Sequence, residues 1–363
     1  MKRLPILVVL IAASSLAFAV KQPTLTAQNS GTNQLLIAVS PVNGDVVWAA
    51  GTGGTYVVTT DGGNTWKAGT VPGALDYQFR NVYGVSATEA YLMSIGNRTT
   101  DFRIYHTTDG GATWKTEFKN ELAGAFYDCF AFWSPTHGIA HSDSVNGVFP
   151  DLVTTNGSNW TSIADNMPPA LPGEASFAAS GTCVSTQGDS NAWITTGGSS
   201  IARVLATTDG GNTWNAYDTP LFSNPDSGGF SVAFRDAQHG ILGGGDLFAK
   251  EPNHARTVKS SDGGQTWTFT NPPPVTGAIF CLAYARGLHH NADDAISGGF
   301  SRTVVVTANT APFFDSGAGA WSPDEGHTWY SLPGVSGYWA VGFANPGAGW
   351  FVGSNGTILK ISF

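Results

Sequence analysis

The sequence predicts an all-β fold, a seven-bladed β-propeller of four-stranded antiparallel blades, on three observations. A phrase of seven or eight residues ending in tryptophan recurs six times, with its tryptophans 46 to 62 residues apart. An apolar strand followed by a polar turn recurs seven times. The composition, with 46 glycines, 12 tryptophans and 12% charged residues, suits short strands joined by tight turns. A repeat of roughly 40 to 50 residues with a Trp-bearing turn is typical of propeller blades.

The first 19 residues read as a secretory signal peptide. Lys2 and Arg3 precede an apolar run that ends at Phe18, and the small residues Ala17 and Ala19 suit cleavage after Ala19. The run is too short to cross a bilayer of roughly 30 Å, and no later segment is apolar for long enough. We therefore expect an exported chain, periplasmic or extracellular, with no transmembrane segment in its mature form and with residues 20–363 forming one domain.

The repeats also set the expected blades. The inner strands start near Leu36, Asn81, Cys129, Cys183, Ser231, Cys281 and Ala340. The expected blades are 34–70, 79–119, 126–163, 177–218, 228–270, 277–332 and 338–363 completed by 21–26. The last blade stops at its third strand, so we predict that a strand from the N-terminus pairs with it. Such a closure removes an open sheet edge.

The recurring phrase has a structural interpretation. Its Asp is expected to accept backbone N–H bonds in the turn between strands three and four, its glycines to adopt conformations closed to other residues, and its Trp to bury its ring. A calcium-binding or catalytic Asp is the less favoured alternative, because the shortened copy at Asn156 would still fold. The residues concerned are Asp61, Trp66, Asp109, Trp114, Asn156, Trp160, Asp209, Trp214, Asp262, Trp267, Asp324 and Trp329.

These phrases resemble a known repeat. The pattern S/T-x-D-x-G-x-T-W is similar to the BNR or Asp-box repeat of sialidases, sortilin-type receptors and some glycanases. With the TVKSSDGGQTW and GTILK segments, the chain looks most like the photosystem II stability/assembly factor family from about residue 34 to its end. The resemblance implies a propeller that presents an arginine-rich face to a membrane-protein partner. Fold alone does not fix activity.

Arginines are the main candidates for partner binding. Arg103, Arg203 and Arg256 each lie six residues before a box Asp, at the start of a third strand. Arg80 and Arg98 are expected on the same mouth of the ring. Arginine binds carboxylates through its forked donors, so we predict that reversing the charge of the three aligned arginines abolishes partner capture without unfolding the protein. The alternative is a set of local ion pairs with acids of the same loops, namely Asp101, Asp128, Asp143, Glu174, Asp226, Asp246 and Glu251.

The three cysteines occupy equivalent positions on inner strands, where small buried residues are needed. We interpret Cys129, Cys183 and Cys281 as buried thiols. A bridge between Cys129 and Cys183 is the alternative, disfavoured because neighbouring blades are expected to hold their Cα atoms beyond the ~7 Å limit.

No cofactor and no metal site are predicted. His137 and His239 fall in equivalent turns, and His289 and His290 precede Asp293 and Asp294, but their spacing does not define a metal-ligand set. The DSGG segment that contains Ser227 is similar to the nucleophile turn of serine proteases. No His and Asp partners can be assigned to this serine, so we interpret the similarity as coincidence.

Two functions follow from the sequence. The first is a non-enzymatic, monomeric module that binds a protein partner. The second is a glycoside hydrolase of sialidase or glycanase type, against which the sequence shows no paired catalytic carboxylates and no arginine between the signal peptide and the first box. Without its signal peptide the chain has 15 basic and 26 acidic residues, a net charge of −11, which disfavours nucleic-acid binding.

Overall fold

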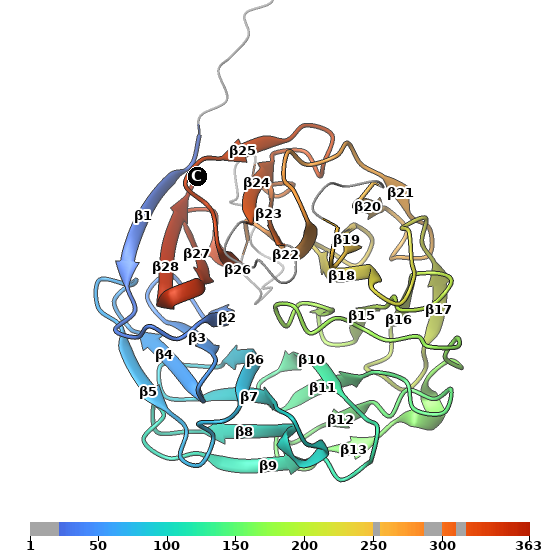
Figure 1. Ribbon diagram of the computed structural model, residues 1–363, viewed down its shortest axis with the longest axis horizontal. Coiled ribbons are helices and arrows are strands. Elements are labelled where there is room, and N and C mark those ends of the chain that lie inside the picture. The colour runs from blue at the N-terminus through green and yellow to red at the C-terminus, as the bar shows by residue number, and fades with distance from the viewer. Residues whose placement is uncertain (1–21, 250–254, 287–299, 310–316) are drawn as a thin grey trace, which may run out of the picture.

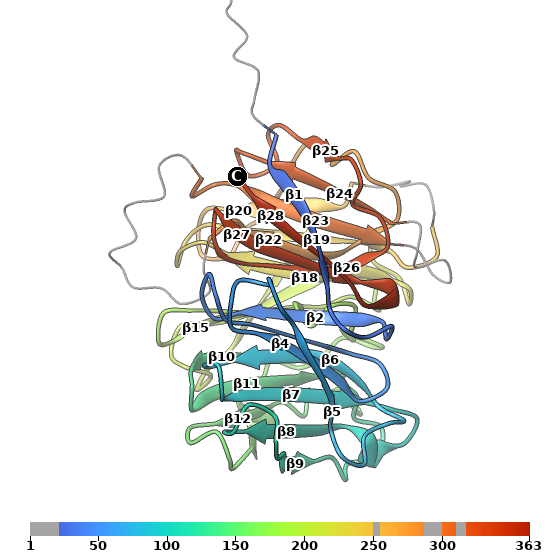
Figure 2. The ribbon, with the colours of Figure 1, turned by 90° about the vertical axis from the view of Figure 1, so that its left-hand side faces the viewer.

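The computed structural model describes residues 22–249, 255–286, 300–309 and 317–363, which form a ring of seven four-stranded antiparallel sheets (Figure 1). The seven-bladed propeller predicted from the sequence is therefore confirmed. In each blade the chain runs from an inner strand at the axis outward to the rim, and Figure 2 shows the sheets stacked side by side around the ring. The proposed signal peptide, Glu251 and the His289, His290, Asp293 and Asp294 cluster lie outside the described residues.

In blades one to six the four strands follow one another in the sequence. Blade one holds β2 (Leu36–Pro41), β3 (Val47–Gly51), β4 (Thr55–Thr59) and β5 (Lys67–Thr70). Blade two holds β6 (Gln78–Gly84), β7 (Ala90–Ile95), β8 (Arg103–Thr107) and β9 (Lys115–Lys119). Blade three holds β10 (Tyr127–Ser134), β11 (His137–Ser142), β12 (Leu152–Thr154) and β13 (Thr161–Ser162). Blade four holds β14 (Val184–Gln187), β15 (Asn191–Thr195), β16 (Arg203–Thr207) and β17 (Asn215–Asp218). Blade five holds β18 (Ser227–Phe234), β19 (Gly240–Asp246), β20 (Thr257–Ser260) and β21 (Thr268–Phe269). Blade six holds β22 (Ala278–Tyr284), β23 (Val304–Asn309), β24 (Ala318–Ser322) and β25 (Tyr330–Leu332).

The seventh blade joins the two ends of the chain, as predicted. It consists of β26 (Tyr338–Asn345), β27 (Ala348–Gly353), β28 (Thr357–Ser362) and, outermost, β1 (Thr24–Asn29). Thr24 pairs with Ser362 and Asn29 with Thr357 in an antiparallel register. The N-terminal strand therefore lies three residues further along the chain than the expected segment 21–26. This pairing covers the outer edge of β28, which would otherwise be exposed.

Large side chains fill the spaces between neighbouring blades. Trp48, Trp193 and Trp350 are fully buried. Trp193 of blade four stacks on Phe234 of blade five at 3.5 Å, with 4° between the ring planes. Aromatic rings bury much apolar surface when they stack or pack edge to face, so the blades are held together mainly by this packing.

The Asp-bearing turns join strands three and four in six blades. In the first, Asp61 Oδ1 accepts the Thr65 N–H at 2.9 Å and Asp61 Oδ2 accepts the Thr65 hydroxyl at 2.6 Å. These bonds favour the ionised form and lower the pKa of Asp61 to about 2. Asn156 keeps two of the backbone bonds, from Ser158 and Asn159 at 3.0 and 2.8 Å.

The tryptophans of these turns are buried to different degrees. Trp214 and Trp267 are buried, whereas Trp66, Trp114, Trp160 and Trp329 are only half-buried. The expectation of a buried ring therefore holds for two of the six. Because Asp61 and its equivalents bond within their own turns, their carboxylates serve the turn conformation.

Candidate functional site

The propeller has two faces. The first carries the connections between strands two and three and those that lead from one blade to the next; we call it the arginine face. The second carries the connections between strands one and two and the Asp-bearing turns; we call it the box face. Arg80, at the start of β6, and Arg103 and Arg203, at the starts of β8 and β16, lie toward the arginine face. Arg256 directly precedes β20, and Arg98 lies in the loop before β8.

A segment of blade four closes the channel at the arginine face. Residues 176–183, the plug segment, precede β14 and cross the axis of the ring. Arg80 Nη1 of blade two donates to Ala178 O at 2.7 Å. Ser180 Oγ donates to Phe280 O of blade six at 2.7 Å. Within the same cluster Phe177 stacks on Phe230 of blade five at 4.0 Å. The plug segment was missed from the sequence, although the extra length between Trp160 and the next inner strand could have indicated it.

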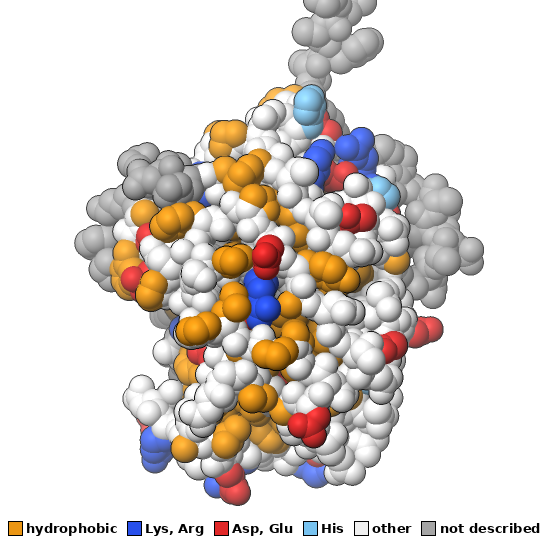
Figure 3. All heavy atoms as spheres, turned by 90° about the vertical axis from the view of Figure 1, so that its right-hand side faces the viewer, with side chains coloured by type: hydrophobic (Ala, Val, Ile, Leu, Met, Phe, Trp, Pro, Cys, Tyr) orange, Lys and Arg blue, Asp and Glu red, His pale blue; other side chains and the backbone are white. Residues whose placement is uncertain are grey.

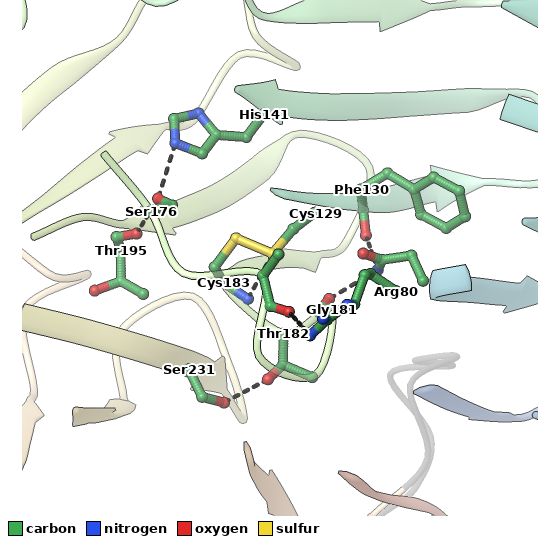
Figure 4. Close-up of a disulfide and its surroundings, with 12 residues drawn as sticks. Arg80, Cys129, Phe130, His141, Ser176, Gly181, Thr182, Cys183, Thr195 and Ser231 are labelled. Carbon is green, nitrogen blue, oxygen red and sulfur yellow. Dashed lines mark hydrogen bonds between the residues drawn. A yellow bond between two sulfur atoms is a disulfide. The ribbon is translucent and has the colours of Figure 1, made fainter. Parts of the chain in front are cut away.

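The plug segment ends in a disulfide between Cys129 and Cys183, with 5.9 Å between the two Cα atoms (Figure 4). The interpretation of both residues as free thiols is therefore wrong, whereas Cys281 is a buried free thiol, as predicted. Inner strands converge at the axis, and Cys183 lies outside β14 on the crossing segment. Both features bring it within the distance that a disulfide requires.

The five arginines divide into two groups. Arg98 has 71% of its side chain exposed while pairing with Asp101 at 3.2 Å. Arg103 is half-buried, with its guanidinium 5.3 Å from the centre of the Tyr77 ring and Nε donating to Thr100 O at 2.9 Å. These two arginines are accessible on the arginine face.

The remaining three hold loops in place. Arg203 is buried and bonds Glu174 through Nε at 2.9 Å and Nη2 at 2.5 Å. Arg256, also buried, donates to the carbonyls of Gly277 and Val275. Removing a buried charge partner is costly, so reversing Arg203 or Arg256 would disturb folding itself. We therefore no longer expect a charge-reversed variant at Arg203 or Arg256 to keep its fold. The alternative considered from the sequence, local ion pairs, is observed for Arg98 and Arg203.

A buried acidic cluster lies beneath the plug segment. Asp128 is buried next to Asp143, and its pKa is raised well above the ordinary range by burial and by the neighbouring carboxyls of Asp143 and Asp151. Arg80 opposes this shift, and burial lowers the pKa of Arg80 itself to about 10. Asp143 in turn accepts the Ser176 N–H of the plug segment at 2.9 Å. The cluster thus joins blade three to the plug.

We expect Asp128→Asn to increase stability at pH 8. A carboxyl whose pKa is raised in the folded state binds its proton more tightly than in the unfolded chain, so stability falls as pH rises above about 4. Asparagine resembles the protonated form and removes this loss. The Tm of the variant should therefore exceed that of the wild type at pH 8 and should fall less between pH 5 and pH 8. Asp165→Asn, at an exposed position, is the control; an unchanged pH dependence in Asp128→Asn would contradict the prediction.

Ser176, His141 and Asp151 form a buried chain of contacts that the sequence did not reveal. His141 Nδ1 lies 2.8 Å from Asp151 Oδ2. Its Nε2 lies 2.9 Å from Ser176 Oγ, a contact that Figure 4 shows. The Ser176 hydroxyl donates to Thr195 O at 2.7 Å, so the histidine must donate to the serine oxygen. An activated nucleophile needs the reverse arrangement, in which the histidine accepts the serine proton. All three residues are buried, and the chain of contacts anchors the plug segment to blade three.

Exposed apolar side chains concentrate on the arginine face. Among the described residues, seven large hydrophobic side chains are exposed, by 37 to 71%. Six of them lie in loops of the arginine face, and the seventh, Phe269, lies on the outer strand β21. The six, which we call the apolar arc, are Leu75, Leu122, Val148, Ile201, Phe222 and Phe248. Exposed apolar side chains gathered on one face are typical of interaction surfaces.

Neither a metal centre nor a membrane-spanning helix is found among the described residues. They contain no group of three or more His, Cys, Asp or Glu side chains placed to hold a metal ion. In the same part of the chain, no helix has the length and apolar character needed to cross a membrane.

Known proteins with similar structures are propellers. No protein-family model and no curated protein matches the sequence. A solved YCF48 bound to a D1 peptide has a TM-score of 0.60 at 17% identity, and the match covers 95% of this chain and 99% of that one. YCF48 from Cyanidioschyzon merolae has the same TM-score at 19% identity, with 93% and 98% of the two chains covered. The GH74 xyloglucanase from Xanthomonas campestris also has a TM-score of 0.60 at 13% identity; this match covers 92% of our chain but 53% of the enzyme. At these identities the likenesses establish the fold alone, which is the one implied by the sequence resemblance.

Proposed function

We propose that this protein is an exported, non-enzymatic propeller, similar to photosystem II assembly factors, that binds a segment of a protein partner on its arginine face. The observation that carries the proposal is the apolar arc, which places six of the seven exposed large hydrophobic side chains of the described residues on that face. A propeller of the same fold has been solved with a peptide bound, which supports a peptide segment as the ligand.

The charges of the same face indicate the chemistry of the partner. Arg98 and Arg103 lie near the end of β9, where Lys119 has 44% of its side chain exposed and pairs with Glu121 at 3.9 Å. Forked guanidinium donors suit carboxylates, and exposed apolar side chains suit an apolar segment. The expected ligand is therefore an extended segment that combines apolar and acidic side chains. Arg80, Arg203 and Arg256 contribute by fixing the loops around it.

Export is supported by the disulfide and by the N-terminal sequence. Disulfides persist in oxidising compartments such as the periplasm and are rare in the reducing cytosol. The Cys129–Cys183 bridge agrees with the signal peptide proposed for residues 1–19. Mass spectrometry of the exported protein should find Val20 at its N-terminus.

The binding proposal is tested by variants of the apolar arc. Leu75→Ser/Leu122→Ser/Phe222→Ser should lose at least tenfold in affinity for the partner while keeping the melting temperature within a few degrees, because all three side chains are exposed. The partner is first captured from envelope extract and identified by mass spectrometry, and overlapping peptides of it are then titrated by fluorescence anisotropy. Phe269→Ser is the matched control, because Phe269 is 49% exposed on β21 and outside the arginine face.

Two outcomes would contradict this proposal. Equal affinity of the arc variant and the Phe269→Ser control would remove the arginine face from partner binding. Hydrolysis of xyloglucan or of a chromogenic sialoside by the purified protein would favour the glycoside hydrolase alternative. Two GH74 enzymes of similar structure are the reason for testing it.

A further inference from the structure

Both ends of the plug segment attach to blade three. At its start, the Ser176 N–H donates to Asp143 Oδ1 at 2.9 Å, and the Ser176 hydroxyl oxygen lies 2.9 Å from His141 Nε2. At its end, Cys183 is bridged to Cys129 (Figure 4). The end is covalently fixed, whereas the start is held by hydrogen bonds alone. A change in those hydrogen bonds can therefore free the start of the segment while the end stays in place.

Asp128 lies beside the groups that hold the start of the plug segment. It directly precedes Cys129 at a bulge of β10, where the pairing with β11 shifts register. Its carboxyl contacts that of Asp143, and its charge interacts with Arg80 of blade two. Arg80 Nη1 in turn donates to Ala178 O of the plug segment at 2.7 Å. The charge of Asp128 therefore acts on two groups that both bind the plug.

The surroundings of Asp128 favour its neutral form. The residue is 1% exposed, and in the described part of the chain no N–H or hydroxyl group donates to its Oδ2. A buried carboxylate without donors is costly, and two carboxyls in contact retain a proton between them. Burial and the carboxyls of Asp143 and Asp151 thus raise the pKa of Asp128 well above its ordinary range, against the opposing effect of Arg80.

The other charged groups near the start of the plug segment are paired. His141 Nδ1 lies 2.8 Å from Asp151 Oδ2, and Glu174 accepts Arg203 Nη2 at 2.5 Å. Charged residues make up 12% of the chain, and on the side of the ring that Figure 3 shows they are scattered among apolar and uncharged side chains. Histidines generally change charge between pH 5 and 8, so His141 is the rival to Asp128 as the source of a pH dependence.

We propose that Asp128 and Asp143 form a proton-dependent latch, which holds the start of the plug segment closed at acidic pH and lets it open as the pH rises. Once Asp128 loses its proton, its carboxylate repels that of Asp143 and attracts Arg80. Both groups then shift away from the plug atoms that they bind, the Ser176 N–H and Ala178 O. Because the plug segment lies at the centre of the arginine face, the latch regulates the surface offered to a partner, an effect that rests on the function proposed above.

The direction of the pH dependence follows from proton linkage. In the closed form the pKa of Asp128 is raised, whereas in the open form its carboxyl meets water and titrates near the ordinary value of about 4. The closed form therefore binds the proton more tightly. Opening becomes more favourable as the pH rises above about 4, by at most about tenfold per pH unit for one proton.

The experiment is hydrogen–deuterium exchange of the full mature chain from pH 5 to pH 8, read by mass spectrometry in the absence of a partner. After correction for the intrinsic exchange rate, the protection of the plug-segment amides should fall at least tenfold over this range. At pH 8 these amides should exchange at least tenfold faster than those of the buried strand β3, which shows that the opening is local.

Variants identify the titrating group. Asp128→Asn should abolish the fall in protection, because its side chain stays neutral and can still donate to Asp143. Asp165→Asn, at an exposed position, is the control and should keep the wild-type pH dependence. Asp143→Asn also removes the repulsion between the two carboxyls, so it should flatten the pH dependence and is informative even where Asp128→Asn folds poorly.

Three results would overturn the latch. Protection of the plug segment that does not change with pH would mean that its closure is independent of a proton. Equal protection of the plug segment and β3 would mean that the plug opens only when the whole ring unfolds. A pH dependence that persists in Asp128→Asn but disappears in His141→Gln would assign the titration to the histidine. Since no partner is present, these results do not depend on whether the arginine face binds one.

Discussion

Cys129→Ala/Cys183→Ala is expected to lower the free energy of unfolding by about 4 kcal/mol, the chain-entropy value for a loop closed across 54 residues. The bridge fastens the plug segment to β10, so its loss also weakens the attachment of the plug to blade three. Urea denaturation, followed by tryptophan fluorescence, measures the difference.

Two controls distinguish the effect of losing the disulfide from the effect of losing the packing of its sulfur atoms. Wild type unfolded in the presence of a reductant should approach the stability of the double variant. Cys281→Ala removes a buried thiol without removing a bridge and should cost much less. A double variant as stable as the wild type would show that the bridge does not constrain the unfolded chain.

Arg203→Ala is expected to cost about 3 to 5 kcal/mol, because it leaves the buried carboxylate of Glu174 without its charge partner. Glu174 also accepts the Leu171 N–H at 2.8 Å and the Thr196 hydroxyl at 2.7 Å. If Glu174 takes up a proton in the variant, the hydrogen bonds that joined it to Arg203 of blade four are still missing. The same urea denaturation measures this loss.

Arg98→Ala supplies the contrast for Arg203→Ala. The Arg98 side chain is 71% exposed on the arginine face, and the buried Asp101 keeps its hydrogen bond from the Arg98 backbone N–H in this variant, so Arg98→Ala should cost much less than Arg203→Ala. The double variant Arg203→Met/Glu174→Met removes both charges together and should recover part of the loss. A cost for Arg203→Ala no greater than that for Arg98→Ala would contradict the structural role of the buried pair.

The repeats made the architecture predictable because each blade repeats one local pattern. The turn at Asp61 and Trp66 depends on side chains within a few residues of each other, so its sequence specifies its hydrogen bonds. The pairing of β1 with β28 followed from a blade that lacked its fourth strand. The positions of Arg103 and Arg203 at third-strand starts also followed from their spacing before the box Asp.

The candidate site was predictable only in part. The spacing placed Arg203 and Arg256 toward one face. Whether their guanidinium groups are exposed to solvent depends on their acceptors, which lie on distant or irregular segments. These acceptors are Glu174 for Arg203 and the carbonyls of Gly277 and Val275 for Arg256. The plug segment follows no repeat, so its path across the axis could not be derived from periodicity. The same path explains why the Cys129–Cys183 distance was overestimated.

The number of blades, their four-stranded form and the closure of the ring could be read from the amino acids alone, because these features depend on local turns and on a regular repeat. The accessibility of each arginine, the joining of two cysteines and the closure of the channel at one face became visible only in the folded ring. Those features arise where segments that are far apart in the chain meet at the axis, and the distances between such segments are set by packing rather than by spacing along the sequence.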